Sequence, residues 1–155
     1  MTALVINNAR DDVHVNTRQT ARGLEVVLNR VIDVNDLIGK PWQRDGRGPD
    51  VYDCWGLTRE ILLRMRPGAS LPDWAIDTMT REKQREIMAG ASQVYGERID
   101  AMEHGALVLL LRAAHIAIVV GGWVITTRRK TGAVAVRVHE YAATYPGLEV
   151  YRWRA

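Results

Sequence analysis

The sequence predicts an α+β fold in which helices come first and an antiparallel sheet follows. Apolar residues recur at helical spacing in residues 54–66 and 80–99, whereas short apolar or alternating segments separated by glycine turns fill residues 106–153. Helices and strands that are segregated along a chain are typical of this class. A length of 155 residues suits one domain with a sizeable core.

The first strongly patterned helix begins at Cys54, the only cysteine of the chain. Its apolar face recurs at spacings of three and four residues and comprises Cys54, Leu57, Ile61, Leu62 and Met65. Asp53 directly precedes the helix, where its carboxylate is able to accept hydrogen bonds from free backbone N–H groups. Pro67 and Gly68 then predict the end of the helix.

The segments around this helix are less uniform. Residues 24–32 are apolar and fit a strand or a helix equally well. Residues 34–42 resemble a short helix closed by Gly39 and Pro41, and residues 43–52 form a glycine-containing loop. That loop lacks the ending of a phosphate-binding loop, so phosphate binding has little support. Residues 80–99 predict a second, more exposed helix.

The C-terminal part predicts five strands that run as an antiparallel meander. They cover residues 106–112, 115–120, 123–127, 133–139 and 148–153. Gly121-Gly122 predicts a tight hairpin turn between the second and third of these strands.

Charge and cysteine content narrow the function classes. The net charge is only +3, which weakly favours a polyanionic neighbour, and the basic turn Arg128–Lys130 is typical of a solvated loop rather than a nucleic-acid site. A single cysteine excludes an intramolecular disulfide and a multi-cysteine metal site, and neither a metal nor a cofactor is expected. The first residues lack the long apolar core of a signal peptide, and the apolar run 106–111 is too short to span a membrane.

Cys54 is a candidate nucleophile because of its place in the first helical turn. The helix dipole and the free N–H groups there stabilise a thiolate. The alternative is that a small thiol at the start of a core helix simply packs, since free cysteine is among the most buried residue types.

A cysteine nucleophile needs a base that is close in space, usually a histidine. The chain has four histidines. His14 lies in a weakly patterned segment, and the pattern around His139 places it within a strand. His104 lies in a turn before the first strand of the sheet. His115 begins the second strand, where it is able to face a helix N-terminus, so it is the preferred base ahead of His104.

Several motifs in this order resemble the NlpC/P60 family of papain-like cysteine peptidases. They are Gly39-Lys40-Pro41-Trp42, the glycine-containing loop, Asp53-Cys54-Trp55-Gly56-Leu57, Gly105-Ala106-Leu107-Val108 and His115-Ile116-Ala117-Ile118-Val119-Val120-Gly121. The pentapeptide at Cys54 is similar to the form found among tail proteins of long-tailed bacteriophages. The resemblance covers residues 34–155 and implies a papain-like domain there. Residues 1–33 are not covered by it and are interpreted as an N-terminal extension, with an arm, an edge strand and a docking segment as the alternatives.

The resemblance implies a role for each site residue. Cys54 attacks an amide carbonyl, its backbone N–H contributes to an oxyanion hole, and His115 acts as base. A third polar residue orients the imidazole, and here that position is Thr126 or Thr127, with His139 as a speculative substitute. Asp53, Trp42, Trp55 and Gly56 support or line the cleft, with Trp42 standing where the family often has tyrosine and Trp55 expected to pack beneath the site.

The implied function is hydrolysis of peptidoglycan stem peptides at bonds that involve D-glutamate and diaminopimelate, during host cell-wall penetration or tail assembly. The implied partners are other tail-tip proteins, and the implied location is a virion tail made in the host cytoplasm and active at the cell wall or in the periplasm. The alternative is a structural tail-tip protein that keeps the fold with weak or no activity, because the orienting position holds a threonine.

Overall fold

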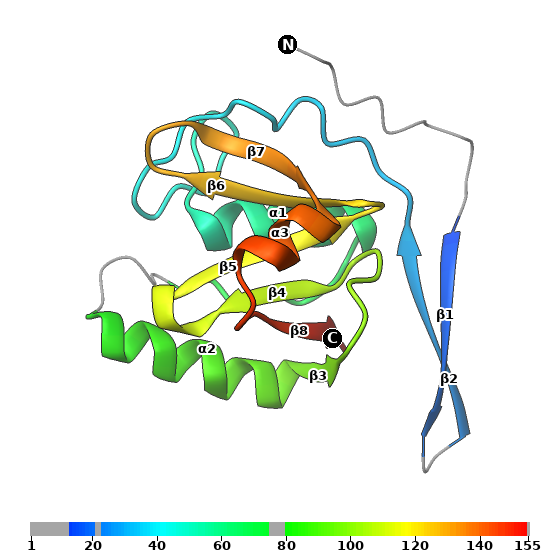
Figure 1. Cartoon of the computed structure of the whole chain (residues 1–155). Coiled ribbons are helices and arrows are strands. Elements are labelled where there is room, and N and C mark those ends of the chain that lie inside the picture. Colours follow the sequence, from blue (N-terminus) through cyan, green and yellow to red (C-terminus); the bar gives the residue numbers. More distant parts are fainter. Residues whose placement is uncertain (1–12, 21–22, 75–79, 155) are drawn as a thin grey trace.

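The computed structural model describes residues 13–20, 23–74 and 80–154, and it confirms the predicted α+β class (Figure 1). Three α-helices are described, α1 (Cys54–Met65), α2 (Arg81–Tyr95) and α3 (Val138–Thr144), together with a short 3-10 helix η2 (Leu111–Ala113). The eight described strands are β1 (Val13–Thr20), β2 (Gly23–Arg30), β3 (Gly96–Ile99), β4 (Leu107–Leu110), β5 (His115–Val120), β6 (Trp123–Arg128), β7 (Gly132–Arg137) and β8 (Glu149–Trp153). None of the described helices is long and apolar enough to cross a membrane.

The main sheet has six strands in the order β3-β8-β4-β5-β6-β7. Strands β4 to β7 follow the predicted meander, and all neighbours in this sheet pair antiparallel. The last strand departs from the prediction, because β8 inserts between β3 and β4 rather than extending the meander. The last described strand therefore lies in the interior of the sheet, and β3 forms the edge beside it.

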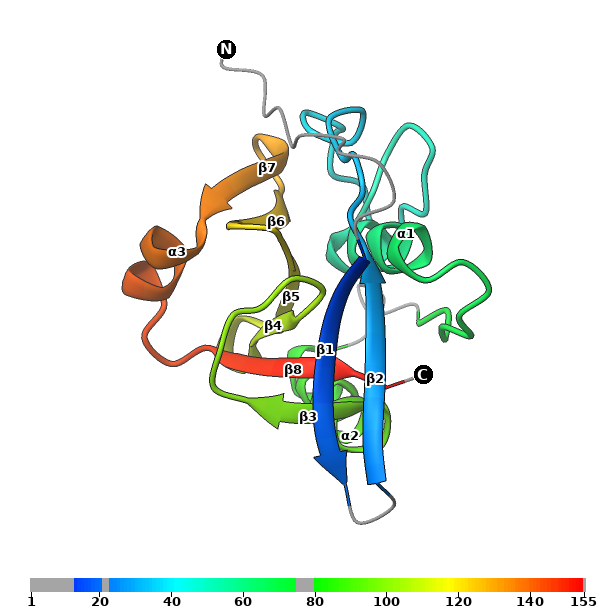
Figure 2. The ribbon, with the colours of Figure 1, turned by 90° about the vertical axis from the view of Figure 1, so that its right-hand side faces the viewer.

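Helices α1 and α3 lie on opposite sides of the sheet (Figure 2). Alternation along β5 explains this arrangement, since Ile116 and Ile118 belong to the core that α1 completes, whereas Ala117 and Val119 pack with Tyr141 of α3. Burial of both faces accounts for the nearly unbroken apolar run in this strand. The start of α1 and the start of β5 are thus held by one continuous core.

The N-terminal hairpin settles the ambiguity at residues 24–32 in favour of a strand. Strands β1 and β2 pair antiparallel from Val13↔Arg30 to Thr20↔Gly23 and form a separate two-stranded sheet that extends away from α1 (Figure 2). The apolar run and turn expected at residues 3–8 lie outside the described residues.

The helix prediction is wrong for residues 35–39 and for residues 96–99, because contacts with distant segments give these residues another structure. Residues 35–39 form turns rather than a helix, because Gly39 adopts φ 87° and the Lys40 carbonyl accepts the Ala133 N–H at 2.9 Å. The second predicted helix stops at Tyr95 instead of continuing to Ile99. Residues 96–99 form β3 because they pair with β8.

His139 lies in α3 and not in the predicted strand. Alternation continues through Val138, but this residue also starts a helical pattern with Tyr141 and Tyr145, and all three pack on the same cluster. Strand β7 therefore ends at Arg137. The His139 side chain is 80% exposed, so it is not a substitute for the residue that orients His115.

Candidate active site

Cys54 is the first residue of α1, as predicted, and Asp53 is the N-cap. The Asp53 carboxylate oxygen Oδ1 accepts the Gly56 N–H at 2.6 Å, and the Asp53 carbonyl accepts the Leu57 N–H at 3.0 Å. Asp53 thus provides hydrogen-bond acceptors for the backbone N–H groups of Gly56 and Leu57 at the start of α1. The Cys54 side chain borders a cleft of about 500 Å³.

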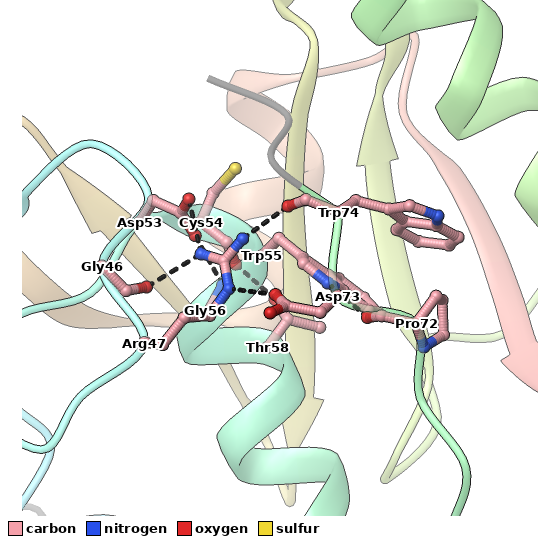
Figure 3. Close-up of polar contacts among 10 residues, drawn as sticks. All are labelled: Gly46, Arg47, Asp53, Cys54, Trp55, Gly56, Thr58, Pro72, Asp73 and Trp74. Carbon is pink, nitrogen blue, oxygen red and sulfur yellow. Dashed lines mark hydrogen bonds and ion pairs between the residues drawn. The ribbon is translucent and has the colours of Figure 1, made fainter. Parts of the chain in front are cut away.

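Arg47 binds the N-cap from the loop before α1 (Figure 3). Its guanidinium donates to four acceptors, one in each of four residues: Asp73 Oδ1 at 2.7 Å, Asp53 Oδ2 at 2.8 Å, Gly46 O at 3.0 Å and Trp74 O at 2.5 Å. Burial alone lowers the pKa of Arg47, but the hydrogen bonds to Asp73 and Asp53 outweigh this effect and raise it. Arg47 therefore ties the loop, the N-cap and residues 73–74 together, while Cys54 projects away from this group (Figure 3).

Gly56 allows the loop to approach the helix. A Cβ at this position would overlap the carbonyl oxygen of Gly46, which itself accepts the Asp53 N–H at 3.2 Å. The glycine is needed here for close backbone approach rather than for an unusual backbone angle.

Gly56→Ala should therefore destabilise the protein by about 2–3 kcal/mol, because a rigid backbone contact has to open. Urea denaturation measures the change. Gly90→Ala is the matched control, since Gly90 lies in α2 with no atom near the added Cβ, and it should raise stability by up to about 1 kcal/mol. Equal stability of Gly56→Ala and wild type would contradict the close approach.

Trp55 packs beneath the site, as expected. It is fully buried, and its Nε1–H donates to the Pro72 carbonyl at 3.0 Å. Its ring centroid lies 4.8 Å from that of Trp74 and 6.1 Å from that of Trp153. These contacts fix the first turn of α1 against the core.

His115 and Cys54 border the same cleft. The His115 Nε2 atom lies 2.5 Å from the Thr126 hydroxyl oxygen. With Nε2 bonded to Thr126, Nδ1 is the ring nitrogen left for a thiol.

Thr126 and Thr127 are distinguished by their partners. The Thr126 hydroxyl bonds His115, and a further side-chain hydrogen bond links it to Tyr141 of α3. The Thr127 hydroxyl is buried and has no hydrogen-bond partner among the residues that the structure describes. Consecutive strand residues face opposite sides of a sheet, so only one of the two threonines reaches the imidazole.

We expect Thr126→Val to lower kcat by roughly 10–100-fold, because a hydrogen bond to a group that becomes charged contributes about 1.5–3 kcal/mol. Thr127→Val is the matched control, and it should leave kcat unchanged because that hydroxyl bonds no group in the described part of the chain. Steady-state hydrolysis by the two variants makes the comparison. A larger loss in Thr127→Val would assign the orienting role to Thr127.

The cleft keeps His115 uncharged near neutral pH. Burial, helped by the positive charge of Arg128, lowers the pKa of His115 to about 4. A histidine in an unfolded chain has a pKa of about 6.5. As pH falls from about 6.5 to about 4, this histidine binds a proton in the unfolded chain before it does so in the folded protein. Its protonation therefore lowers the free energy of unfolding over that pH range.

Arg128→Gln should raise the pKa of His115, because it removes a positive charge that disfavours the imidazolium. NMR titration of the His115 ring resonances measures the shift. Arg129→Gln, at the next position, is the matched control and should shift the titration less. An unchanged titration in Arg128→Gln would leave burial as the cause of the low pKa.

The remaining sequence candidates lie away from Cys54 or act structurally. His104 Nδ1 accepts the Gly121 N–H at 2.9 Å and its Nε2 contacts the Arg30 carbonyl at 2.9 Å, so this ring joins the β5–β6 turn to β2. His104 is therefore not the base of this cleft.

Trp42 does border the cleft, and there the Arg129 guanidinium lies 4.7 Å from the centroid of its ring.

Two features of the site were not found from the sequence. One is Arg47, which contacts residues 6 and 26 or more positions away in the chain. The other is a set of arginines around the cleft: Arg44, Arg81, Arg128 and Arg129. The sequence pattern singles out only the basic turn at residues 128–130, and it gives no link between that turn and Arg44 or Arg81.

The arrangement joins a helix-start thiol, an uncharged imidazole and a hydroxyl that holds the imidazole. These are the parts required for nucleophilic attack by sulfur with histidine as base. Among the described residues, no group of His, Cys, Asp and Glu side chains is arranged to hold a metal ion.

Comparison with known proteins gives the family. No curated protein matches the chain. The family model described as NlpC/P60 matches residues 39–148, which include Cys54, His115 and Thr126. The chain therefore belongs to the NlpC/P60 family.

Proposed function

We propose that this protein is a cysteine peptidase that hydrolyses amide bonds in peptidoglycan stem peptides. Its family suggests a cell-wall peptidase, since NlpC/P60 domains are generally cysteine hydrolases that act on peptidoglycan. The observation that carries the proposal is the cleft shared by Cys54, His115 and Thr126. The preferred bonds are those that involve D-glutamate and diaminopimelate, as the family resemblance implies.

In the first half of the reaction, His115 takes the thiol proton as Cys54 sulfur attacks the amide carbon. The carbon–oxygen double bond opens to a tetrahedral oxyanion, and the Cys54 backbone N–H stabilises the developing charge. Imidazolium then protonates the leaving amine, and the carbon–nitrogen bond breaks to give a thioester. Thr126 holds the ring through Nε2 during both transfers.

In the second half, water attacks the thioester. His115 accepts a proton from this water, the carbon–sulfur bond breaks, and the thiol is restored when the imidazolium returns its proton to Cys54. The overall change is hydrolysis of one amide to an acid and an amine. The test is incubation with purified stem peptides, with mass spectrometry of the products; fragments that result from cleavage at any other bond would refute the preferred site.

We further propose that the protein acts in a bacteriophage tail, at the host cell wall, with residues 1–33 as a docking arm on the domain formed by residues 34–155. Support comes from the form of the Asp53–Leu57 motif and from the β1–β2 hairpin, which precedes the family match at residue 39. Antibody labelling of purified virions should place the protein at the tail. Its absence from virions would refute this setting.

A structural role without catalysis is the second candidate. It is favoured by the hydroxyl at Thr126, where the family commonly has histidine, asparagine or glutamine. The discriminating measurement is the pH dependence of Cys54 alkylation in wild type and His115→Ala. A thiol that reacts fast below pH 7 and slows without His115 supports the enzyme, whereas one that reacts only near its ordinary pKa of about 8.5 supports the structural role.

A further inference from the structure

Four arginines from separate segments line the cleft that contains Cys54. They are Arg44 of the loop before α1, Arg81 at the start of α2, and Arg128 and Arg129 at the β6–β7 turn. No described residue that lines this cleft is Asp or Glu. Because the whole chain carries a net charge of only +3, positive charge is concentrated at this cleft.

These four arginines differ from others in the same protein. Within the described ranges, none of the four forms a salt bridge, whereas Arg47, Arg64 and Arg152 each bind two carboxylates. The guanidinium groups around the cleft are thus left without an anionic partner in the described part of the chain. A ligand is able to supply that partner.

Two of these arginines are held in place by neighbours that are not acidic. The Arg129 guanidinium lies over the Trp42 ring, and Arg81 donates to the Ala113 carbonyl at 3.4 Å, two residues before His115. Stacking and a backbone acceptor orient a guanidinium without neutralising its charge. These arginines therefore flank the reacting groups and keep their charge for a ligand.

We propose that Arg44, Arg81 and Arg129 bind free carboxylates of the substrate, so that the enzyme selects stem peptides with free acid groups over peptides in which those groups are amidated. The proposal rests on the proposed function. A guanidinium binds a carboxylate through two parallel charge-assisted hydrogen bonds. A carboxamide is neutral, so its interaction with the guanidinium does not compensate for the hydration that the guanidinium loses on binding. The ligand is a peptide rather than a nucleic acid because the thiol and imidazole of the same cleft act on a carbonyl carbon.

The direct test compares two synthetic stem peptides that differ only in one group, a free carboxylate or a carboxamide beside the scissile bond. We expect the wild type to cleave the acid with roughly 10–100-fold higher kcat/KM. Arg44→Gln, Arg81→Gln or Arg129→Gln should shrink this ratio toward one. Arg154→Gln, which removes the same charge from an exposed residue beyond β8, should preserve it. Equal kcat/KM for the two peptides in wild type would overturn the proposal.

A binding measurement separates this proposal from the proposed function. Each peptide is titrated into the Cys54→Ala variant, and calorimetry measures its affinity without hydrolysis of the peptide. Tighter binding of the acid, weakened by high salt, supports the proposal even if wild type cleaves neither peptide, in which case only the proposed function fails. Equal affinity for the acid peptide and the amide peptide would overturn the proposal that the arginines bind carboxylates. Tight binding of a single-stranded oligonucleotide that displaces the acid peptide would overturn it as well.

Discussion

Replacing Cys54 with alanine should abolish stem-peptide hydrolysis and leave the fold intact. In the proposed mechanism the thiol forms the covalent bond of the first step, so its removal should lower kcat by at least about 10,000-fold. The fold should survive because the N-cap bonds of α1 come from Asp53 and the lost group is small. Mass spectrometry of products measures the activity, and circular dichroism during heating measures the stability.

Cys54→Ser is the companion variant, because it keeps the size of the side chain and replaces the thiol with a hydroxyl that is far harder to deprotonate. It should fold like wild type and be nearly as inactive as Cys54→Ala. Hydrolysis that persists unchanged in either variant would show that another group carries the reaction. A folded and inactive pair would assign the chemistry to sulfur.

The part of the site that local sequence controls was predictable. Asp53 before an apolar helical pattern fixes the start of α1, and therefore places Cys54 at its first residue. The choice between Thr126 and Thr127 also follows from local geometry. A two-residue turn at Gly121-Gly122 pairs Val120 with Trp123, and that register puts Thr126 on the same face as His115.

The part of the site that depends on distant contacts was not predictable. Arg47 lies in a loop without periodicity, and nothing in the local pattern indicates that Asp53 and Asp73 both bind it. The position of β8 between β3 and β4 likewise depends on pairing between segments about 50 residues apart. His139 was misplaced because the pattern at Val138 fits the end of a strand and the start of a helix equally well.

Arg47→Met should have a large effect on both stability and thiol reactivity. The Asp53 carboxylate is only 1% exposed, and the Arg47 side chain is 22% exposed, so the variant leaves a buried charge without its partner. Loss of one member of such a pair costs about 3–5 kcal/mol. The uncompensated carboxylate next to Cys54 should also oppose thiolate formation, so alkylation should require a higher pH. Urea denaturation and the pH profile of iodoacetamide labelling measure the two effects.

Arg152→Met separates the electrostatic effect from a general loss of stability. Arg152 binds Glu103 and Glu97 through its guanidinium, with its side chain 16% exposed, and it does not border the Cys54 cleft. This control should lose stability but keep the wild-type alkylation profile. Arg47→Met combined with Asp53→Asn should move alkylation back toward lower pH, because the carboxylate charge is then absent. If Arg47→Met and Arg152→Met alkylate alike, Arg47 supports the fold without influencing the thiol.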